Sequence, residues 1–302
     1  MVRNKDNGLI YISKKIRVIG MNIEEVDKVK QEVWLMQKFS HPCIVELIES
    51  FLDNEVFVII MEFCAGGDLE KLISFHKKQN AIFPEDSIKD WIAQMASALS
   101  HVHSMKIIHR DIKPSNIFIT SDGRLKLGDF GISKVLENTN DSASTLIGTP
   151  LYMSPEVCSN QSYSYKTDMW SLGCVFYELC TFTRPFESDS LIGLAMKILH
   201  STPPHIPNAY STDLQCLISS LLHKEPSLRP SARDVLISLG MCDLYSNPEL
   251  EKNRSQLYSY SIENFNFDSF NTASKTEDYS SDFDSFSINQ ESVRYEDDFE
   301  SY

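Results

Sequence analysis

Four residues close together in the chain carry the side chains that phosphoryl transfer requires: Asp111, Lys113, Asn116 and Asp129. The reaction needs a carboxylate to accept the proton of the substrate hydroxyl, a cation near the transferred phosphate, and hard oxygen ligands for magnesium. Asp111 supplies the carboxylate and Lys113 the cation, while Asn116 and Asp129 supply the oxygen ligands. The alternative is a chance hairpin with solvated charges. It is rejected because two motifs, His109–Asn116 and Gly128–Gly131, occur in the order that phosphoryl transfer requires.

A short hairpin is predicted between these residues. Ile117–Ile119 and Leu125–Leu127 have the composition of strands, and Ser121–Gly123 has that of a turn. Because the strands pair, the hairpin is expected to bring Asn116 beside Asp129.

Composition narrows the class of partner and compartment. The chain has 302 residues, a hydrophobic fraction of 42% and a formal net charge of −14, which argues against a nucleic-acid partner and favours protein substrates. Seven cysteines without metal-type pairs argue against disulfides or a zinc site and fit the cytoplasm, with the nucleus as the alternative. No apolar run predicts a signal peptide or a membrane span, so we expect a soluble chain with no membrane partner.

The composition changes sharply near residue 245. Residues 251–302 contain twelve acidic and four basic residues, with few aliphatic ones. Such a segment cannot bury enough apolar surface to offset its chain entropy, so residues 246–302 are predicted to be an acidic, disordered tail that is dispensable for catalysis. The alternative is a docking or phosphorylation segment that folds on a regulatory partner.

Several segments together resemble the eukaryotic protein kinases, over residues 1–245. They are His109–Asn116, Gly128–Gly131, Gly148–Glu156, Asp168–Gly173 and Leu228–Pro230. Three more segments resemble the NIMA-related serine/threonine kinases in particular: His41–Val45, Met61–Leu69 and Ile147–Pro150.

The resemblance implies an α+β, two-lobed protein kinase fold, with a small β-rich lobe (1–65, truncated at its start) and a larger helical lobe (66–245). It also implies transfer of the γ-phosphoryl group of ATP to serine or threonine of protein substrates, with Mg²⁺. Asp111 then accepts the hydroxyl proton, and Lys113, followed by Pro114, indicates serine/threonine specificity. Asn116 and Asp129 bind the metal.

Lys14 is predicted to lie on a strand among aliphatic residues that alternate with it. A lysine in that setting needs an anionic partner, and Glu32, on a helix predicted over 24–39, is the candidate. In kinases the corresponding pair holds the α- and β-phosphates of ATP. Lys15 is the rival, on a less enclosed face.

The apolar run Val56–Met61 predicts a strand buried on both faces. The resemblance places Met61 at the back of the adenine pocket and lets the backbone of Glu62 and Cys64 bond the base. An ordinary core methionine is the alternative for Met61. Asp68 is expected at the start of a helix. Its side chain serves as the N-terminal cap, as a ribose contact, or as both.

Apolar residues recur at helical spacing from Ile88 to Val102 and predict a helix that ends just before the catalytic segment. His101 and His103 lie near its end. Their spacing puts them on different faces, so they are expected to be structural rather than metal ligands.

Thr145 lies where NIMA-related kinases carry an activating threonine. A phosphate on it is expected to pair with Arg110 and order the surrounding segment, whereas an unmodified polar loop is the alternative. The family also implies a buried Glu156–Arg229 ion pair, and it places Asp168 beneath the catalytic segment.

One kinase feature is missing from the sequence. Gly8 and Gly20 are the only glycines before Gly66, so no Gly-x-Gly-x-x-Gly turn precedes Lys14 to cover the ATP phosphates. The strand before that turn is also expected to be absent, which would leave a sheet edge exposed and ATP weakly bound. Either the chain is truncated or it is divergent. The competing function is therefore a pseudokinase or weakly active kinase that acts as a binding scaffold.

Overall fold

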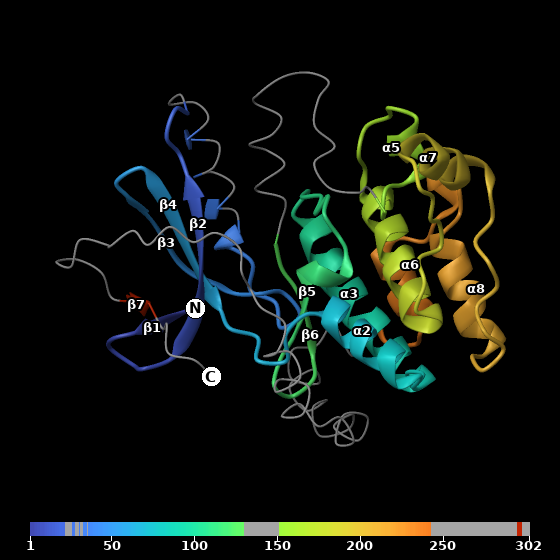
Figure 1. Cartoon of the computed structure of the whole chain (residues 1–302), viewed down its shortest axis with the longest axis horizontal. Coiled ribbons are helices and arrows are strands. Elements are labelled where there is room, and N and C mark those ends of the chain that lie inside the picture. The colour runs from blue at the N-terminus through green and yellow to red at the C-terminus, as the bar shows by residue number, and fades with distance from the viewer. Residues whose placement is uncertain are drawn as a thin grey trace.

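The computed structural model describes residues 1–21, 26–27, 30, 33–34, 36–129, 151–242 and 295–297. Strands form one side of the molecule and helices the other, with a two-stranded hairpin between them (Figure 1). This α+β, two-lobed arrangement is the predicted fold class. None of the helices in these ranges is long and apolar enough to cross a bilayer.

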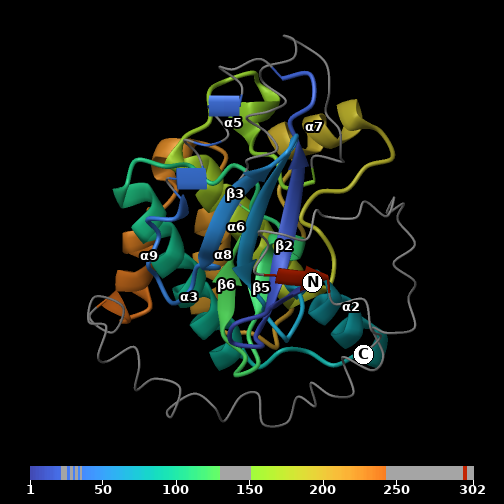
Figure 2. The same cartoon turned by 90° about the vertical axis from the view of Figure 1, so that its left-hand side faces the viewer.

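The small lobe is a five-stranded sheet with the strand order β3-β4-β2-β1-β7. Its strands are β1 (Val2–Asn4), β2 (Ile10–Arg17), β3 (Leu47–Asp53), β4 (Val56–Glu62) and β7 (Tyr295–Asp297). All neighbouring pairs are antiparallel. Figure 2 shows this sheet lying in front of the helical lobe.

β4 is buried on both faces, as its continuous apolar run predicts. Phe57 and Ile59 pack with Val33, whereas Val58 and Ile60 pack with Val2 on the opposite face. Successive strand residues alternate between faces, so both layers of side chains are supplied by one apolar run. The strand therefore forms a rigid support for the segment that follows it.

The edge of the sheet differs from the sequence prediction. A tight turn at Asn4–Leu9, closed by the Asn4 amide on the Leu9 carbonyl (2.9 Å), lets β1 pair with β2. Gly8 enables this turn with a φ of +71°. The strand expected to be absent before Lys14 is present as β1, and it covers the edge of β2 that was expected to be exposed. The other edge of β1 pairs with β7 from the tail.

Within the segment 246–302, which was predicted to be disordered, Tyr295–Asp297 form a strand. Backbone pairing explains this strand, because an unpaired strand edge can order a segment through main-chain hydrogen bonds. The remaining tail residues lie outside the described ranges.

Helices form the larger lobe and are packed around one core. They are α2 (Leu69–Gln79), α3 (Glu85–Ser104), α5 (Pro155–Cys158), α6 (Tyr165–Thr181), α7 (Leu191–His200), α8 (Thr212–Leu221) and α9 (Ala232–Ser238), with short 3₁₀ turns η1 (Pro114–Asn116) and η2 (Pro226–Leu228). The predicted stripe from Ile88 to Val102 lies on α3 and is almost fully buried. The described residues 26–27, 30, 33–34 and 36 of the predicted 24–39 helix are helical.

Between the lobes, β5 (Ile117–Ile119) and β6 (Leu125–Leu127) form the predicted hairpin. Its strands are joined to the small lobe by the Val45 amide, which donates to the Leu127 carbonyl at 2.9 Å. The Gly128 amide donates to the Asn116 carbonyl at 3.0 Å. The hairpin therefore brings the segments that carry Asn116 and Asp129 together, as expected.

Candidate active site

The carboxylate of Asp111 is oriented by two neighbours in its own loop. Oδ2 of Asp111 lies 2.9 Å from Nζ of Lys113 and accepts a hydrogen bond of 2.8 Å from Nδ2 of Asn116. The same amide nitrogen donates to the Asp111 carbonyl at 2.8 Å. The Asp111 side chain keeps a quarter of its surface exposed. A substrate hydroxyl can therefore reach a carboxylate that is already fixed in direction.

His109 connects this loop to the segment before Asp129. Its Nε2 lies 3.0 Å from the Gly128 carbonyl, and the Asp111 amide donates to its Nδ1 at 3.3 Å. A carbonyl only accepts, so Nε2 carries the proton and the ring is neutral. Burial lowers the pKa of His109, although nearby carboxylates oppose the shift. His109 is therefore a positioning residue.

Asp168 holds the backbone of the loop from beneath, as the resemblance implied. Its Oδ2 accepts the His109 amide at 2.9 Å, and its Oδ1 accepts the Arg110 amide at 3.0 Å. Oδ2 also lies 2.8 Å from Nε2 of His103. Sequence reasoning assigned His103 only a structural place, and its spacing gave no sign of this contact across the lobe.

Lys14 and Asp129 lie within hydrogen-bond contact, and each side chain is partly exposed. Lys15 is exposed, so the preference for Lys14 over its rival agrees with the burial pattern of β2. The predicted partner, Glu32, lies outside the described residues. The described structure instead joins Lys14, from the small lobe, to the carboxylate that was predicted to bind magnesium.

The segment after β4 carries the predicted nucleotide contacts. The Glu62 amide donates to the Glu46 carbonyl at 3.0 Å, so of its two backbone groups only the carbonyl can serve a base. Met61 packs partly buried on the cluster around Ile59. Cys64 is buried, which raises the pKa of its thiol to about 12 and keeps it protonated.

Asp68 caps α2, one of the two roles predicted for it. Its Oδ1 accepts the Lys71 amide at 2.9 Å, and its Oδ2 lies 3.4 Å from Nζ of Lys71. A further contact, missed from the sequence, joins the lobes nearby: Nζ of Lys126 lies 2.6 Å from Oε1 of Glu62. Nothing in the sequence indicated this partner.

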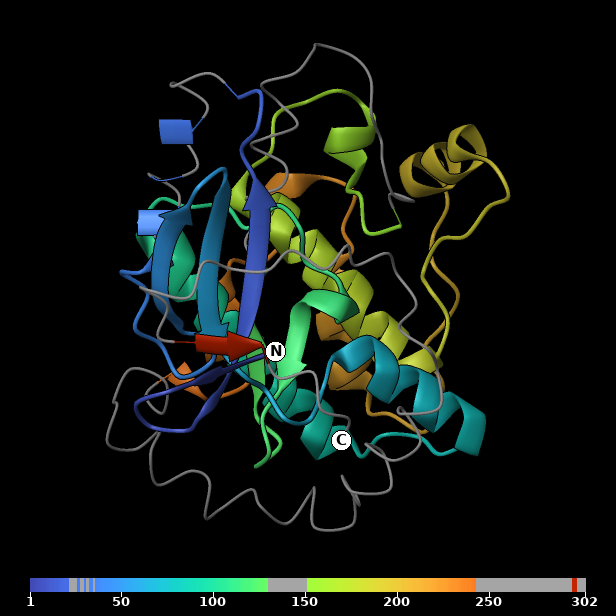
Figure 3. The same ribbon diagram turned by 60° about the vertical axis from the view of Figure 1, so that its left-hand side comes forward.

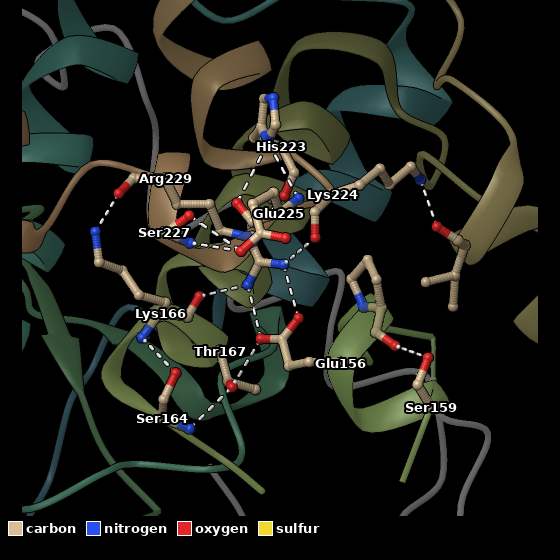
Figure 4. Close-up of polar contacts among 12 residues, drawn as sticks. Glu156, Ser159, Ser164, Lys166, Thr167, His223, Lys224, Glu225, Ser227 and Arg229 are labelled. Atoms are coloured by element: carbon tan, nitrogen blue, oxygen red, sulfur yellow. Dashed lines mark hydrogen bonds and ion pairs between the residues drawn. The ribbon is translucent and has the colours of Figure 1, made fainter. Parts of the chain in front are cut away.

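The predicted Glu156–Arg229 pair is present and buried (Figure 4). Both Arg229 terminal nitrogens donate to Glu156 oxygens at 2.7 Å, and Thr167 donates to Oε1 of Glu156 at 2.9 Å. Arg229 also donates to three carbonyls, of His223, Lys166 and Lys224. Burial alone would raise the pKa of Glu156, but the Arg229 hydrogen bonds outweigh it and the pKa is lowered.

The donor set fits magnesium that arrives with a nucleotide. Among the described residues, no group of three His, Cys, Asp or Glu side chains could hold a metal ion alone. Magnesium commonly uses one or two carboxylates together with substrate phosphates, so such a cage is not required. Because Nδ2 of Asn116 is committed to Asp111, its side-chain oxygen is the atom suited to a cation. Asp129 supplies the carboxylate.

The fold and the site together define a protein kinase domain. The fold is a small antiparallel sheet and a helical lobe, and the site between them contains the oriented Asp111 with Lys113, Asn116 and Asp129. The protein kinase domain family matches residues 1–238, and the chain belongs to this family.

Individual relatives agree with the subgroup that the motifs indicated. The chain is 44% identical to the serine/threonine-protein kinase Nek1 of Mus musculus over 236 residues, which are 78% of this chain and 20% of that protein. It is 44% identical to Nek5 of Homo sapiens (78% and 33%) and 40% identical to Nek4 of Mus musculus (78% and 30%). These relatives are NIMA-related kinases. The chain thus spans a fifth to a third of their length.

Proposed function

We propose that this chain transfers the γ-phosphoryl group of ATP to serine or threonine hydroxyls of protein substrates. The observation that carries the proposal is the Asp111 carboxylate, fixed by Lys113 and Asn116 while still partly exposed. Pro114 after Lys113 favours serine and threonine over tyrosine, by resemblance to the family.

Asp111 accepts the proton of the substrate hydroxyl as that oxygen forms a bond to the γ-phosphorus. The bond from the γ-phosphorus to the β,γ-bridging oxygen breaks, and its electron pair leaves with ADP. Lys113 stabilises the negative charge on the transferred group. The short contacts to Asp111 mean that little reorganisation is needed when the charge moves.

Nucleotide binding is assigned to the groups around Lys14 and the end of β4. Met61 borders the adenine, the Glu62 carbonyl and the Cys64 backbone contact its polar edge, and Asp68 lies on the ribose side. Lys14 now contacts Asp129, so the α- and β-phosphates would replace that carboxylate as the partner of Lys14. Glu32 is proposed as its second partner.

Asn116 and Asp129 would hold magnesium against the phosphates. The ion supplies positive charge that offsets the charge of the triphosphate when bound. Asn116 precedes β5 and Asp129 follows β6, so the β5–β6 hairpin holds the two proposed metal ligands together. Asn116 also contacts Asp111, so the metal site and the catalytic carboxylate share this residue.

The test compares Asp111→Asn with Asp122→Asn, an exposed turn aspartate in the same hairpin. Phosphate transfer from labelled ATP to a serine/threonine peptide should fall on the order of 10²- to 10⁴-fold in the first variant and stay unchanged in the second. Equal activity in both variants would remove Asp111 from the chemistry.

The alternative is a pseudokinase or weakly active kinase that acts as a binding scaffold. Calorimetric titration of ATP with and without Mg²⁺ separates the two functions. Binding that Mg²⁺ strengthens, together with transfer that Asp111→Asn abolishes, supports the kinase. Binding with no Asp111-dependent transfer supports the scaffold.

The class of substrate, the location and the regulatory partner are also proposals. Protein substrates, rather than nucleic acids or membranes, suit the net charge of −14 and a cytoplasmic location, with the nucleus as the alternative. The acidic tail would carry any regulatory partner.

A further inference from the structure

The outer edge of β1 is covered by a strand from the far end of the chain. β1 pairs antiparallel with β7 in the register Val2↔Asp297, Arg3↔Glu296 and Asn4↔Tyr295. Figures 1 and 3 show β7 lying against β1. The two strands end the sheet opposite β3 in the strand order. Almost the entire length of the chain separates the two strands.

The backbone of β1 explains why this edge can bind a strand. The Asn4 amide points toward β2, where it donates to the Leu9 carbonyl. Successive residues of a strand direct their backbone groups to opposite edges, so the amide and carbonyl of Arg3 face β7. The register partner of Arg3 on that side is Glu296.

Charge favours the same pairing. Arg3 is exposed on β1, and Lys5 follows the strand. On the tail side, Glu296 and Asp297 lie in β7, and Asp298 follows. Opposite charges at directly paired positions stabilise antiparallel strands. The basic edge of the sheet and the acidic end of the tail are therefore complementary.

We propose that the β1 edge is a strand-docking surface and that its occupant is the tail segment Tyr295–Asp297 of the same chain. The docked strand closes the sheet and supports the hairpin whose second arm, β2, carries Lys14. Any other strand that pairs with this edge, from this chain or another, must displace β7. The proposal rests on no part of the catalytic assignment.

A first experiment measures amide hydrogen exchange by NMR in the full chain, with Glu296→Pro and, as control, Ser287→Pro. Proline at 296 removes the amide that faces Arg3, whereas residue 287 lies in the tail before β7. One lost hydrogen bond corresponds to about tenfold faster exchange, so the Arg3 amide should exchange at least about tenfold faster in Glu296→Pro only. Equal protection in all three proteins would overturn the proposal, because something else would cover the edge.

A second experiment leaves the tail sequence unaltered. Trypsin can cut after Arg294, immediately before β7, and after Lys275, which serves as the internal reference. Arg3→Glu places like charges at the paired positions 3 and 296, while Arg17→Glu makes the same charge change at the exposed end of β2.

Cleavage after Arg294, relative to Lys275, should be several-fold faster in Arg3→Glu than in the wild type and unchanged in Arg17→Glu. It should not depend on protein concentration, because the strand comes from the same chain. The same relative rate in all three proteins, or protection that grows with concentration, would contradict an intramolecular strand.

Discussion

Oδ1 of Asp168 accepts the backbone amide of Arg110 at 3.0 Å, and Arg110 has a φ of +68°. A residue other than glycine in this left-handed region carries a strain of about 1–3 kcal/mol and persists only where its surroundings hold it. Asp168 is 1% exposed and also accepts the His109 amide. It therefore fixes the backbone conformation immediately before Asp111.

The first prediction concerns Asp168→Asn. The substituted amide keeps one acceptor oxygen but turns a donor toward the other backbone amide, so the loop loses one of its two supports. We expect kcat to fall by about tenfold to 10²-fold through misplacement of Asp111. The dissociation constant for ATP should stay the same, because the groups around β4 and Lys14 are untouched.

Steady-state kinetics and nucleotide titration measure the two quantities separately. Asp213→Asn, an exposed position in the first turn of α8, is the control. If Asp168→Asn weakens ATP binding as much as it lowers kcat, the residue supports the whole domain and not this loop.

The second prediction concerns the buried pair of Glu156 and Arg229. Glu156→Ala leaves the Arg229 guanidinium buried without its carboxylate, which should lower the free energy of unfolding by about 3–5 kcal/mol. Glu187→Ala removes one carboxylate near Arg184, in a partly exposed pair with a separation of 3.8 Å, and should cost less than about 1 kcal/mol.

Urea unfolding of both variants gives the comparison. A double-mutant cycle with Arg229→Ala isolates the coupling between Glu156 and Arg229. Equal losses in the buried and the exposed pair would mean that the domain relaxes to hydrate Arg229.

Local periodicity was enough to predict much of this fold. The apolar run of β4, the stripe on α3 and the turn between β5 and β6 each follow from residues within one element. The catalytic loop was predictable for the same reason, because Asp111, Lys113 and Asn116 lie within one loop and contact each other.

Contacts between distant elements could not be predicted from local periodicity. Tyr295–Asp297 lacks the β-branched residues that mark strands, and it is ordered by an edge of the sheet from the other end of the chain. Lys126 contacts Glu62, and His103 contacts Asp168, because the lobes and helices pack in one particular way. No spacing within the sequence encodes those partners.

The third prediction is that Thr145, which lies outside the described residues, carries an activating phosphate. Arg110 is exposed beside Asp111, and its Cζ lies 5.9 Å from the centroid of the Tyr163 ring. Mass spectrometry after incubation with ATP should find the phosphate. Thr145→Ala should lower activity several-fold, whereas Ser142→Ala should not.

Arg110→Ala tests the partner. If the phosphate acts through Arg110, the double variant is no less active than either single variant, because both remove the same contact. Additive losses would place the phosphate on a different cation.

The fourth prediction concerns pH and His41. Burial lowers the pKa of His41 from 6.5 to about 4, with smaller contributions from the charges of His101 and Lys126. The Cys43 amide donates to Nδ1 of His41 at 3.1 Å, and Nε2 lies 3.0 Å from the Ser97 hydroxyl, so the folded state holds a neutral ring.

Between pH 4 and 6.5 the unfolded chain therefore binds a proton at His41 that the folded chain does not, and stability rises with pH across this range. From pH 7 to pH 5 the free energy of unfolding should fall by about 2 kcal/mol more in the wild type than in His41→Gln. The matched control is His205→Gln, at an exposed position, which should keep the wild-type dependence. Urea unfolding at pH 5, 6 and 7 measures all three proteins. If His41→Gln retains the full wild-type slope, the ring is protonated in the folded state at pH 5 and its environment is more polar than its burial implies.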